Sequence, residues 1–317
     1  MKTKIGIPRG MFYYDYHLLW EEFFKNLGGE VVVSPKTNKD ILNQGITTCV
    51  DEACLAVKVF HGHVDYLKDK VDYIFIPKFI SIYKREYCCP KHLGLPDMVR
   101  NSILDLPEII EPVINLRNSK KSLKESIFYS GKYLTKSKKD IFKAYEIAYD
   151  RFKEFNKSKI LDKNIGLEEN NRKILVLGHP YNIYDNYINM DIEKKLKGNN
   201  IKIINAEMID KSTARDYAVK LSKRMFWTQG QRIVGSAFSL IDNGEVDGII
   251  YISAFGCGLD SVLIELVERR ARENNIPFIL LTIDEQTGEA GINTRIEAFL
   301  DMLEWRDTNE DNISTYG

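Results

Sequence analysis

Short apolar runs alternate with longer amphipathic stretches along most of the chain, and this pattern predicts strands and helices in turn. The predicted strands lie within residues 4–8, 30–35, 71–78, 173–180, 201–209, 246–258 and 277–284. The predicted helices span residues 11–27, 38–42, 51–67, 184–196, 213–241, 261–273 and 294–304, and one more starts near Pro96 and Asp97. Strands that alternate with helices imply parallel pairing through right-handed crossovers.

The strand signal disappears between the two halves of the chain. Ile141, Tyr145, Ala148 and Phe152 recur there at helical spacing, which predicts a long connecting helix. The polar run at residues 162–173 predicts a domain boundary. We therefore expect an N-terminal α/β domain at residues 1–118, a helical connector at 119–165 and a C-terminal α/β domain at 166–317. The predicted fold class is α/β: two tandem Rossmann- or flavodoxin-like domains with mostly parallel sheets and a cleft between them.

Composition and charge narrow the class of protein further. The chain has 317 residues, 44% hydrophobic and 28% charged, which is ordinary for globular domains. Its 45 Lys and Arg residues balance its 45 Asp and Glu residues, so no global field favours nucleic acid or an anionic membrane. The longest apolar runs are shorter than the roughly 18 residues of a membrane span. No apolar signal region follows the N-terminal charges, so we expect a cytoplasmic protein.

Three cysteines lie where a predicted strand gives way to a helix. Cys257 sits between two glycines after an apolar strand, and Asp260 and Ser261 could cap the next helix. Cys89 precedes a proline, as in ligand runs of ferredoxins, and we expect its neighbour Cys88 to pack or support it. Ligands of open α/β sheets bind at such strand ends. Each position alone is also compatible with a buried structural thiol.

The third cysteine, Cys54, falls in the first turns of the helix predicted from residue 51. Lys58, four residues on, would share its helix face and could stabilise an anionic sulfur. Cys49 is expected to be a packing thiol. At most one of His61 and His63 is expected to face the cleft, and structural polar contacts are the alternative for both. His179 is expected to begin a loop after a strand. Close C-x-x-C pairs typical of zinc sites are absent from the sequence.

Five segments resemble the 2-hydroxyacyl-CoA dehydratase superfamily: DEACLAVKVFHGHVDYLKDKVDYIFIPK, YCCPKHLGLPD, GHPYNIYD, AFGCGLDS and TIDEQTGEAGINTRIEAFLD. The chain is most similar to the stand-alone module related to CoA-substrate-specific enzyme activases. This resemblance implies two α/β domains that hold a [4Fe–4S] cluster, or a double cubane, through Cys54, Cys89 and Cys257. It implies Lys58, His61 and His179 as candidates for the groups around the cluster.

The resemblance also implies partners. An ATP-dependent activase with an actin-like ATPase fold would supply low-potential electrons for reductive or dehydratase-like chemistry. A related dehydratase-like subunit and an acyl-CoA or small-molecule substrate are further expected partners. The sequence has no counterpart of the ATPase domain and no GxxxxGK[ST] or GxGxxG motif, so nucleotide hydrolysis and hydride transfer are not expected of this chain.

Two other interpretations stay open at this point. The chain could be a cluster-free module that binds a CoA ester or assembles with the activase. It could also be a cysteine-dependent transferase or hydrolase, in which only His61 or His63 could serve as a base beside Cys54.

Overall fold

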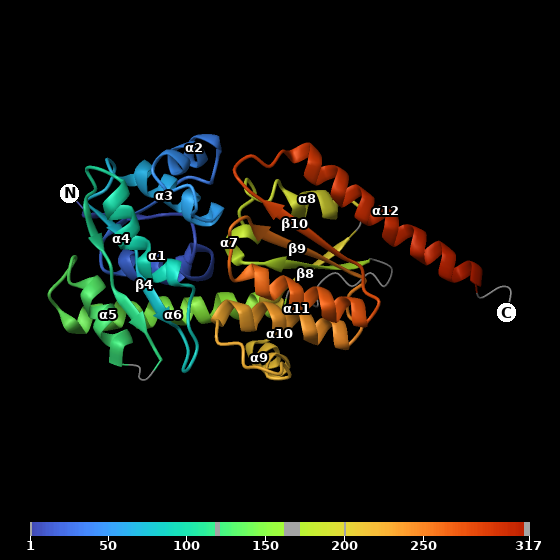
Figure 1. The fold of residues 1–317 in the computed structure, drawn as a ribbon. Coiled ribbons are helices and arrows are strands. Elements are labelled where there is room, and N and C mark those ends of the chain that lie inside the picture. The colour runs from blue at the N-terminus through green and yellow to red at the C-terminus, as the bar shows by residue number, and fades with distance from the viewer. Residues whose placement is uncertain (1, 118–120, 162–171, 200, 314–317) are drawn as a thin grey trace.

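Two four-stranded parallel sheets form the centres of two lobes in the computed structural model, which describes residues 2–117, 121–161, 172–199 and 201–313 (Figure 1). The first lobe has the strand order β2-β1-β3-β5 and the second lobe β10-β9-β7-β8. All pairings between these strands are parallel. The strands are β1 (Lys4–Ile7), β2 (Glu30–Val33), β3 (Tyr73–Phe75), β5 (Glu108–Ile110), β7 (Lys173–Gly178), β8 (Lys202–Asn205), β9 (Gly248–Ala254) and β10 (Phe278–Ile283). The predicted α/β class with mostly parallel sheets is confirmed.

The two sheets share one topology. Read from its other edge, the second sheet runs β8-β7-β9-β10, which is the pattern of β2-β1-β3-β5 in the first. In each lobe the second strand (β2 or β8) lies on one side of the first strand (β1 or β7), and the third strand (β3 or β9) lies on its other side. The place where the direction reverses is the usual ligand position in such sheets. In the second lobe it lies beyond the adjacent ends of β7 and β9.

Helices cover both faces of each sheet, and the sequence reason is that these strands are apolar on both sides. In the second lobe, α8 and α12 lie on one face, and α9, α10 and α11 on the other (Figure 1). The helices are α1 (Tyr13–Asn26), α2 (Lys39–Thr47), α3 (Leu55–Leu67), α4 (Pro90–Ser102), α5 (Lys121–Gly131), α6 (Lys138–Leu161), α7 (Pro180–Ile183), α8 (Ile192–Lys197), the 3₁₀ helix η2 (Ala206–Met208), α9 (Lys211–Ala218), α10 (Thr228–Asp242), α11 (Asp260–Glu273) and α12 (Glu289–Ile313). A small third sheet pairs β4 (Lys78–Ser81) with β6 (Val113–Asn115).

The predicted connecting helix is present as α6. Its residues Ile141, Ala148 and Phe152 are buried in the aromatic core of the first lobe, where α1 also packs. The polar run predicted as a boundary falls mainly on residues 162–171, outside the described residues, as do residues 118–120 beside the other predicted boundary. The domain limits therefore stay a prediction. None of the described helices combines the length and the apolar character that crossing a bilayer requires.

The lobes are joined by buried contacts and by a backbone pairing. Leu55 and Val59 of α3 belong to a core made mostly by the second lobe, and Tyr181 of α7 belongs to a core of the first lobe. Tyr87 accepts a backbone hydrogen bond from Thr228 and donates one to Phe226. The segment that carries Cys88 and Cys89 is thereby fastened to the second lobe.

Several predicted helix limits are wrong. The helix expected from residue 51 begins at Leu55, because residues 51–53 form a turn closed by a bond from the Ala53 amide to the Val50 carbonyl. The helix expected near Pro96 begins at Pro90. The long helical region predicted for residues 213–241 is two helices, α9 and α10, separated by residues 219–227.

Candidate functional site

The three predicted cysteines each precede a helix. Cys54 is the N-cap residue of α3, and Cys89 is the N-cap residue of α4, with Pro90 in the first turn. Cys257 lies between β9 and α11. Helix N-termini carry partial positive charge and favour anionic groups. Accordingly, the amides of Val57 and Lys91 partly offset the effect of burial, which raises the thiol pKa of Cys54 and Cys89.

The structure brings these three cysteines together where the lobes meet. A Cβ atom on Gly256 would lie 3.7 Å from Cα of Cys54, so the Cys257 loop of the second lobe passes directly over the start of α3. The charges of Cys257 and Cys89 raise the pKa of Cys54, after burial, and the charge of Cys257 also raises that of Cys89. We refer to Cys54, Cys89 and Cys257 as the cysteine cluster.

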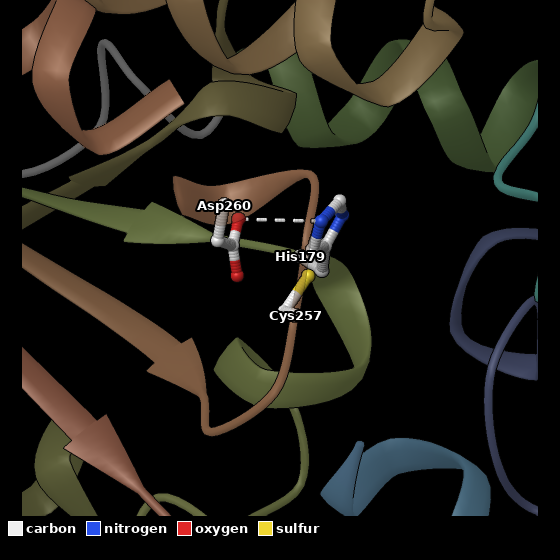
Figure 2. Close-up of side chains that lie close together, drawn as sticks. All are labelled: His179, Cys257 and Asp260. Carbon is white, nitrogen blue, oxygen red and sulfur yellow. Dashed lines mark ion pairs between the residues drawn. The ribbon is translucent and has the colours of Figure 1, made fainter. Parts of the chain in front are cut away.

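Beside Cys257 lies a buried pair of charged residues (Figure 2). One ligating atom of each of His179, Cys257 and Asp260 lies within 4.8 Å of the others, an arrangement that could hold a metal ion. His179 follows β7 and Asp260 begins α11 after β9, so both lie where the second sheet changes direction. Nε2 of His179 is 3.3 Å from Oδ1 of Asp260, and both side chains are almost fully buried.

The Asp260 carboxylate is embedded in a network of donors. It accepts hydrogen bonds from the Tyr251 hydroxyl at 2.7 Å and from the Ser253 hydroxyl at 3.0 Å. Burial alone would raise the pKa of Asp260, but His179 and these two donors outweigh it and lower the pKa. Burial likewise works against His179, but Asp260 and Cys257 raise its pKa well above the usual value. The pair is therefore ionised together.

This network corrects the prediction that Asp260 and Ser261 cap the helix after Cys257. The N-cap residue of α11 is Leu259, and no side chain caps the helix there. Asp260 is the first helical residue and points into the core, whereas the Ser261 hydroxyl donates to the Gly258 carbonyl. The Asp260 carboxylate at this helix start therefore forms an ion pair with His179 and does not cap the helix.

Tyr181 is a site residue that the sequence analysis missed. Its ring stacks on that of His179, with centroids 5.0 Å apart and planes 17° apart, and it is buried at the start of α7. Burial raises its pKa, and so do the charges of Cys257, Asp260, Cys54 and Cys89. The charges of all three thiols therefore act on the Tyr181 hydroxyl. The segment GHPYN marks a loop after a strand, but no signal in it distinguishes Tyr181 from a packing aromatic.

Lys58 and His61 have other partners than the cysteine cluster. Lys58 is buried and its Nζ lies 2.6 Å from the Glu285 carboxylate, in the loop after β10. The cation whose charge lowers the pKa of Cys54 is Lys91. His61 is buried with Nδ1 2.8 Å from the Val57 carbonyl oxygen. Cys54 precedes the helix, so the four-residue spacing does not place it on one helix face with Lys58.

The two remaining cysteines lie in different surroundings. Burial raises the pKa of Cys49, and the charges of Lys58 and Lys91 oppose it. Cys88 packs against the aromatic core of the first lobe. Burial raises the pKa of Cys88, and the charge of Asp15 adds to this effect. Both thiols are partly exposed.

Comparison with known proteins gives one family. The family model described as "CoA enzyme activase uncharacterised domain (DUF2229)" matches residues 4–209. The matched part contains Cys54, Cys89 and His179, and Cys257 lies beyond its end. No curated protein sequence matches the chain.

Among solved structures, the chain is similar to the crystal structure of ZnuA, with 10% identity and a TM-score of 0.31 over 96% of this chain and 99% of that one. A FpvC mutant from Pseudomonas aeruginosa is 11% identical, with a TM-score of 0.29 over 95% of this chain and 99% of that one. The open structure of CD0873 from Clostridium difficile is 13% identical, with a TM-score of 0.23 over 88% and 74%. Likenesses this distant carry no information about function.

Proposed function

Because the chain belongs to the family of CoA enzyme activase domains whose model spans residues 4–209, we propose that it is an iron–sulfur protein that works with an ATP-dependent activase. Cys54, Cys89 and Cys257 would hold a [4Fe–4S]-type cluster where the two lobes meet. The observation that supports this proposal is that the Cys257 loop of the second lobe passes directly over Cys54, while Cys54 and Cys89 each begin a helix of the first lobe.

The donors fit a cluster better than a single ion. Thiolates are the ligands that iron–sulfur clusters take, and three of them leave one iron of a cubane open. A single ion at His179, Cys257 and Asp260 would have to compete with the Tyr251 and Ser253 hydroxyls for the carboxylate. Nδ1 of His179 is buried without a hydrogen-bond partner among the described residues, and a cluster sulfide or thiolate could accept from it.

The surrounding residues would set the properties of the cluster. When bound, such a cluster supplies one-electron chemistry, and its open iron can bind a substrate or a bridging sulfide. Gly256 lets the Cys257 loop approach α3, the Tyr181 ring stacks on His179, and His179 places a donor beside Cys257. Lys58 joins α3 to the loop after β10 through its ion pair with Glu285, and His61 hydrogen-bonds to the Val57 carbonyl within α3.

The wider proposal follows the family resemblance. The chain would accept low-potential electrons from an activase of the actin-like ATPase fold, and a related dehydratase-like subunit could assemble with it. The reaction would be a reduction or a dehydratase-like elimination on an acyl-CoA or small-molecule substrate. Membership of the 2-hydroxyacyl-CoA dehydratase superfamily, a double cubane in place of a single one, and a cytoplasmic location are parts of the same proposal.

The test is iron and sulfide content after strictly anaerobic reconstitution. Wild-type protein should contain about four irons and about four sulfides per chain, or about twice that for a double cubane. Cys54→Ala, Cys89→Ala and Cys257→Ala should each lose most of both. Cys49→Ala and Cys88→Ala are the matched controls and should keep them.

Three results would contradict the proposal. Full iron in Cys257→Ala would remove that ligand from the assignment. A folded, colourless wild-type protein after reconstitution would favour the cluster-free module that binds a CoA ester or assembles with the activase. One equivalent of metal without sulfide, lost in Asp260→Asn, would indicate a mononuclear site instead.

A further inference from the structure

A cavity between the lobes, separate from the cysteine cluster, has a volume of about 460 Å³. Its walls come from α1, α6, η2, α9 and α10, and none of Cys54, Cys89 and Cys257 lines it. This volume is in the range of small-molecule sites. The function proposed above makes no use of this space.

Four cations on this wall have no carboxylate partner among the described residues, and one of them, Lys157, is an exposed residue of α6. The other three carry the argument. They come from three different helices: Lys159 from α6, Lys211 from α9 and Arg232 from α10. Lys159 lies over the Tyr184 ring, and Lys211 donates to the Tyr83 hydroxyl at 3.0 Å.

Arg232 is the most constrained of the three. Its Nη2 donates to the Glu207 carbonyl at 3.1 Å, and its Nη1 is buried without a partner among the described residues. Burial lowers the pKa of its guanidinium, because removing the charged group from water is unfavourable. A guanidinium with unused donors is suited to a carboxylate or phosphate.

Four acidic side chains, Asp15, Glu86, Glu207 and Asp210, face six Lys and Arg side chains in this lining. The charges of Glu207 and Asp210 act on Arg232, but neither carboxylate forms an ion pair with it, so they offset the positive charge only in part. Glu86 is already paired with Arg215 at 3.0 Å, and Asp210 caps α9 through the Ser212 amide. Burial and the charge of Glu207 raise the pKa of Asp15 to about 7, so this carboxyl is only partly ionised at neutral pH. The wall therefore carries an excess of positive charge.

Several aromatic side chains also line the cavity. Phe12, Tyr16, Phe152 and Tyr184 contribute rings from α6, from the segment around α1 and from the loop after α7. Aromatic side chains favour stacking with flat rings. The cavity is therefore lined by cations from three helices and by several aromatic rings, which suits a flat anionic ligand.

We propose that this cavity binds a planar aromatic molecule with two negative charges, either carboxylates or phosphate oxygens, held by Arg232, Lys211 and Lys159. The site is independent of the cysteine cluster, so the proposal stands or falls separately from the proposed function. Terephthalate is a suitable probe, because it is a flat ring with a carboxylate at each end. Terephthalamide has the ring without the charge, and succinate has two charges without the ring.

Binding is measured by calorimetry on the full chain at a pH of about 8, where Asp15 is ionised. Terephthalate should bind at least about tenfold more tightly than either terephthalamide or succinate. Arg232→Gln and Lys211→Gln should each weaken terephthalate binding about tenfold, the usual effect of losing a charge-assisted contact. Lys124→Gln removes an exposed charge on α5 and should leave binding unchanged.

Asp15→Asn is expected to strengthen terephthalate binding, a result that a loss of folding could not produce. It removes a negative charge from the same wall, so terephthalate should bind about fivefold more tightly. Weaker binding in Asp15→Asn, equal binding of terephthalate and terephthalamide, or no terephthalate binding by wild type would each overturn the proposal. Retained binding in Cys257→Ala is expected, and its loss would place the ligand at the cysteine cluster instead.

Discussion

The Tyr14 hydroxyl of α1 donates a 2.9 Å hydrogen bond to the Asp185 carboxylate, which follows α7 in the other lobe. The same carboxylate accepts from the Thr37 hydroxyl and from two backbone amides. Burial raises the pKa of Asp185, although these donors oppose it. One buried side chain of the second lobe is therefore held by two hydroxyls of the first, which fixes how the lobes meet.

Replacing Tyr14 by Phe should lower the free energy of unfolding by about 1–3 kcal/mol, because a buried carboxylate oxygen loses a donor. Tyr66→Phe is the control, since the Tyr66 hydroxyl bonds no other described residue. It should change stability by less than about 0.5 kcal/mol. Urea unfolding of both variants checks this. Equal, small effects would show that the Tyr14–Asp185 bond does not hold the lobes together.

His63 contacts Thr37, one of the residues that hold Asp185. Because His63 is buried, we expect the protein to lose stability in mild acid. Its Nε2 is 3.0 Å from the Thr37 hydroxyl, and burial lowers its pKa to about 3. Below a pH of about 6.5, His63 becomes protonated in the unfolded chain but stays neutral in the folded protein. Stability should therefore fall by about 2 kcal/mol between pH 7 and 5 from this residue alone.

His63→Gln removes the titration, so the loss of stability between these two pH values should shrink by about that amount. The measurement is urea unfolding at both pH values. A uniform destabilisation by the substitution does not affect this difference. An unchanged difference would mean that His63 is protonated in the folded protein.

The sequence was sufficient for the architecture because the strands are unambiguous. Runs such as KILVLG and GIIYISA are apolar at nearly every position, and only a sheet covered on both faces buries them that way. Helix limits were less well specified. Asp51 and Glu52 look like the acidic first turn of a helix, but the backbone turns there and the helix starts four residues later. Pro96, a common first-turn residue, lies within α4 instead.

The candidate site could be predicted only in part, because its contacts depend on strand order. Cys54, Cys89 and Cys257 stand out as thiols at loop ends, and parallel strands bring such loops to one edge. The pairing of His179 with Asp260 requires β7 and β9 to be neighbours, which no local pattern reveals. Local spacing was misleading for Lys58, because Cys54 lies just outside the helix and Glu285 offers a closer partner.

The two glycines beside Cys257 should respond differently to substitution. Gly256 has a φ of +77°, a conformation that costs an L-residue about 1–2 kcal/mol, and its loop lies against Cys54. Gly256→Ala should lower stability by about that amount and should reduce iron content after reconstitution. Around Gly258 a Cβ atom would meet no atom within 4 Å, so Gly258→Ala should change neither. Matching behaviour of the two variants would contradict a tight approach of the Cys257 loop to α3.

The contact between α2 and α3 depends on glycine, and it sets the position of Cys54. A Cβ atom on Gly62 would overlap the Ile41 carbonyl oxygen, and one on Gly45 would overlap the Lys58 carbonyl oxygen. The two helix backbones therefore touch directly. Gly62→Ala should lower the free energy of unfolding by about 2–3 kcal/mol, because the helices must separate to admit the methyl group.

Gly94→Ala provides the opposite expectation in a comparable helix. A Cβ atom there would meet only Sδ of Met98, at 3.9 Å, and Gly94 lies inside α4. Alanine should raise stability by about 0.5–1 kcal/mol, because it restricts the unfolded chain at no steric cost. Urea unfolding of both variants gives the comparison. If Gly62→Ala is also neutral or stabilising, the close contact with α2 does not hold α3 and Cys54 in place.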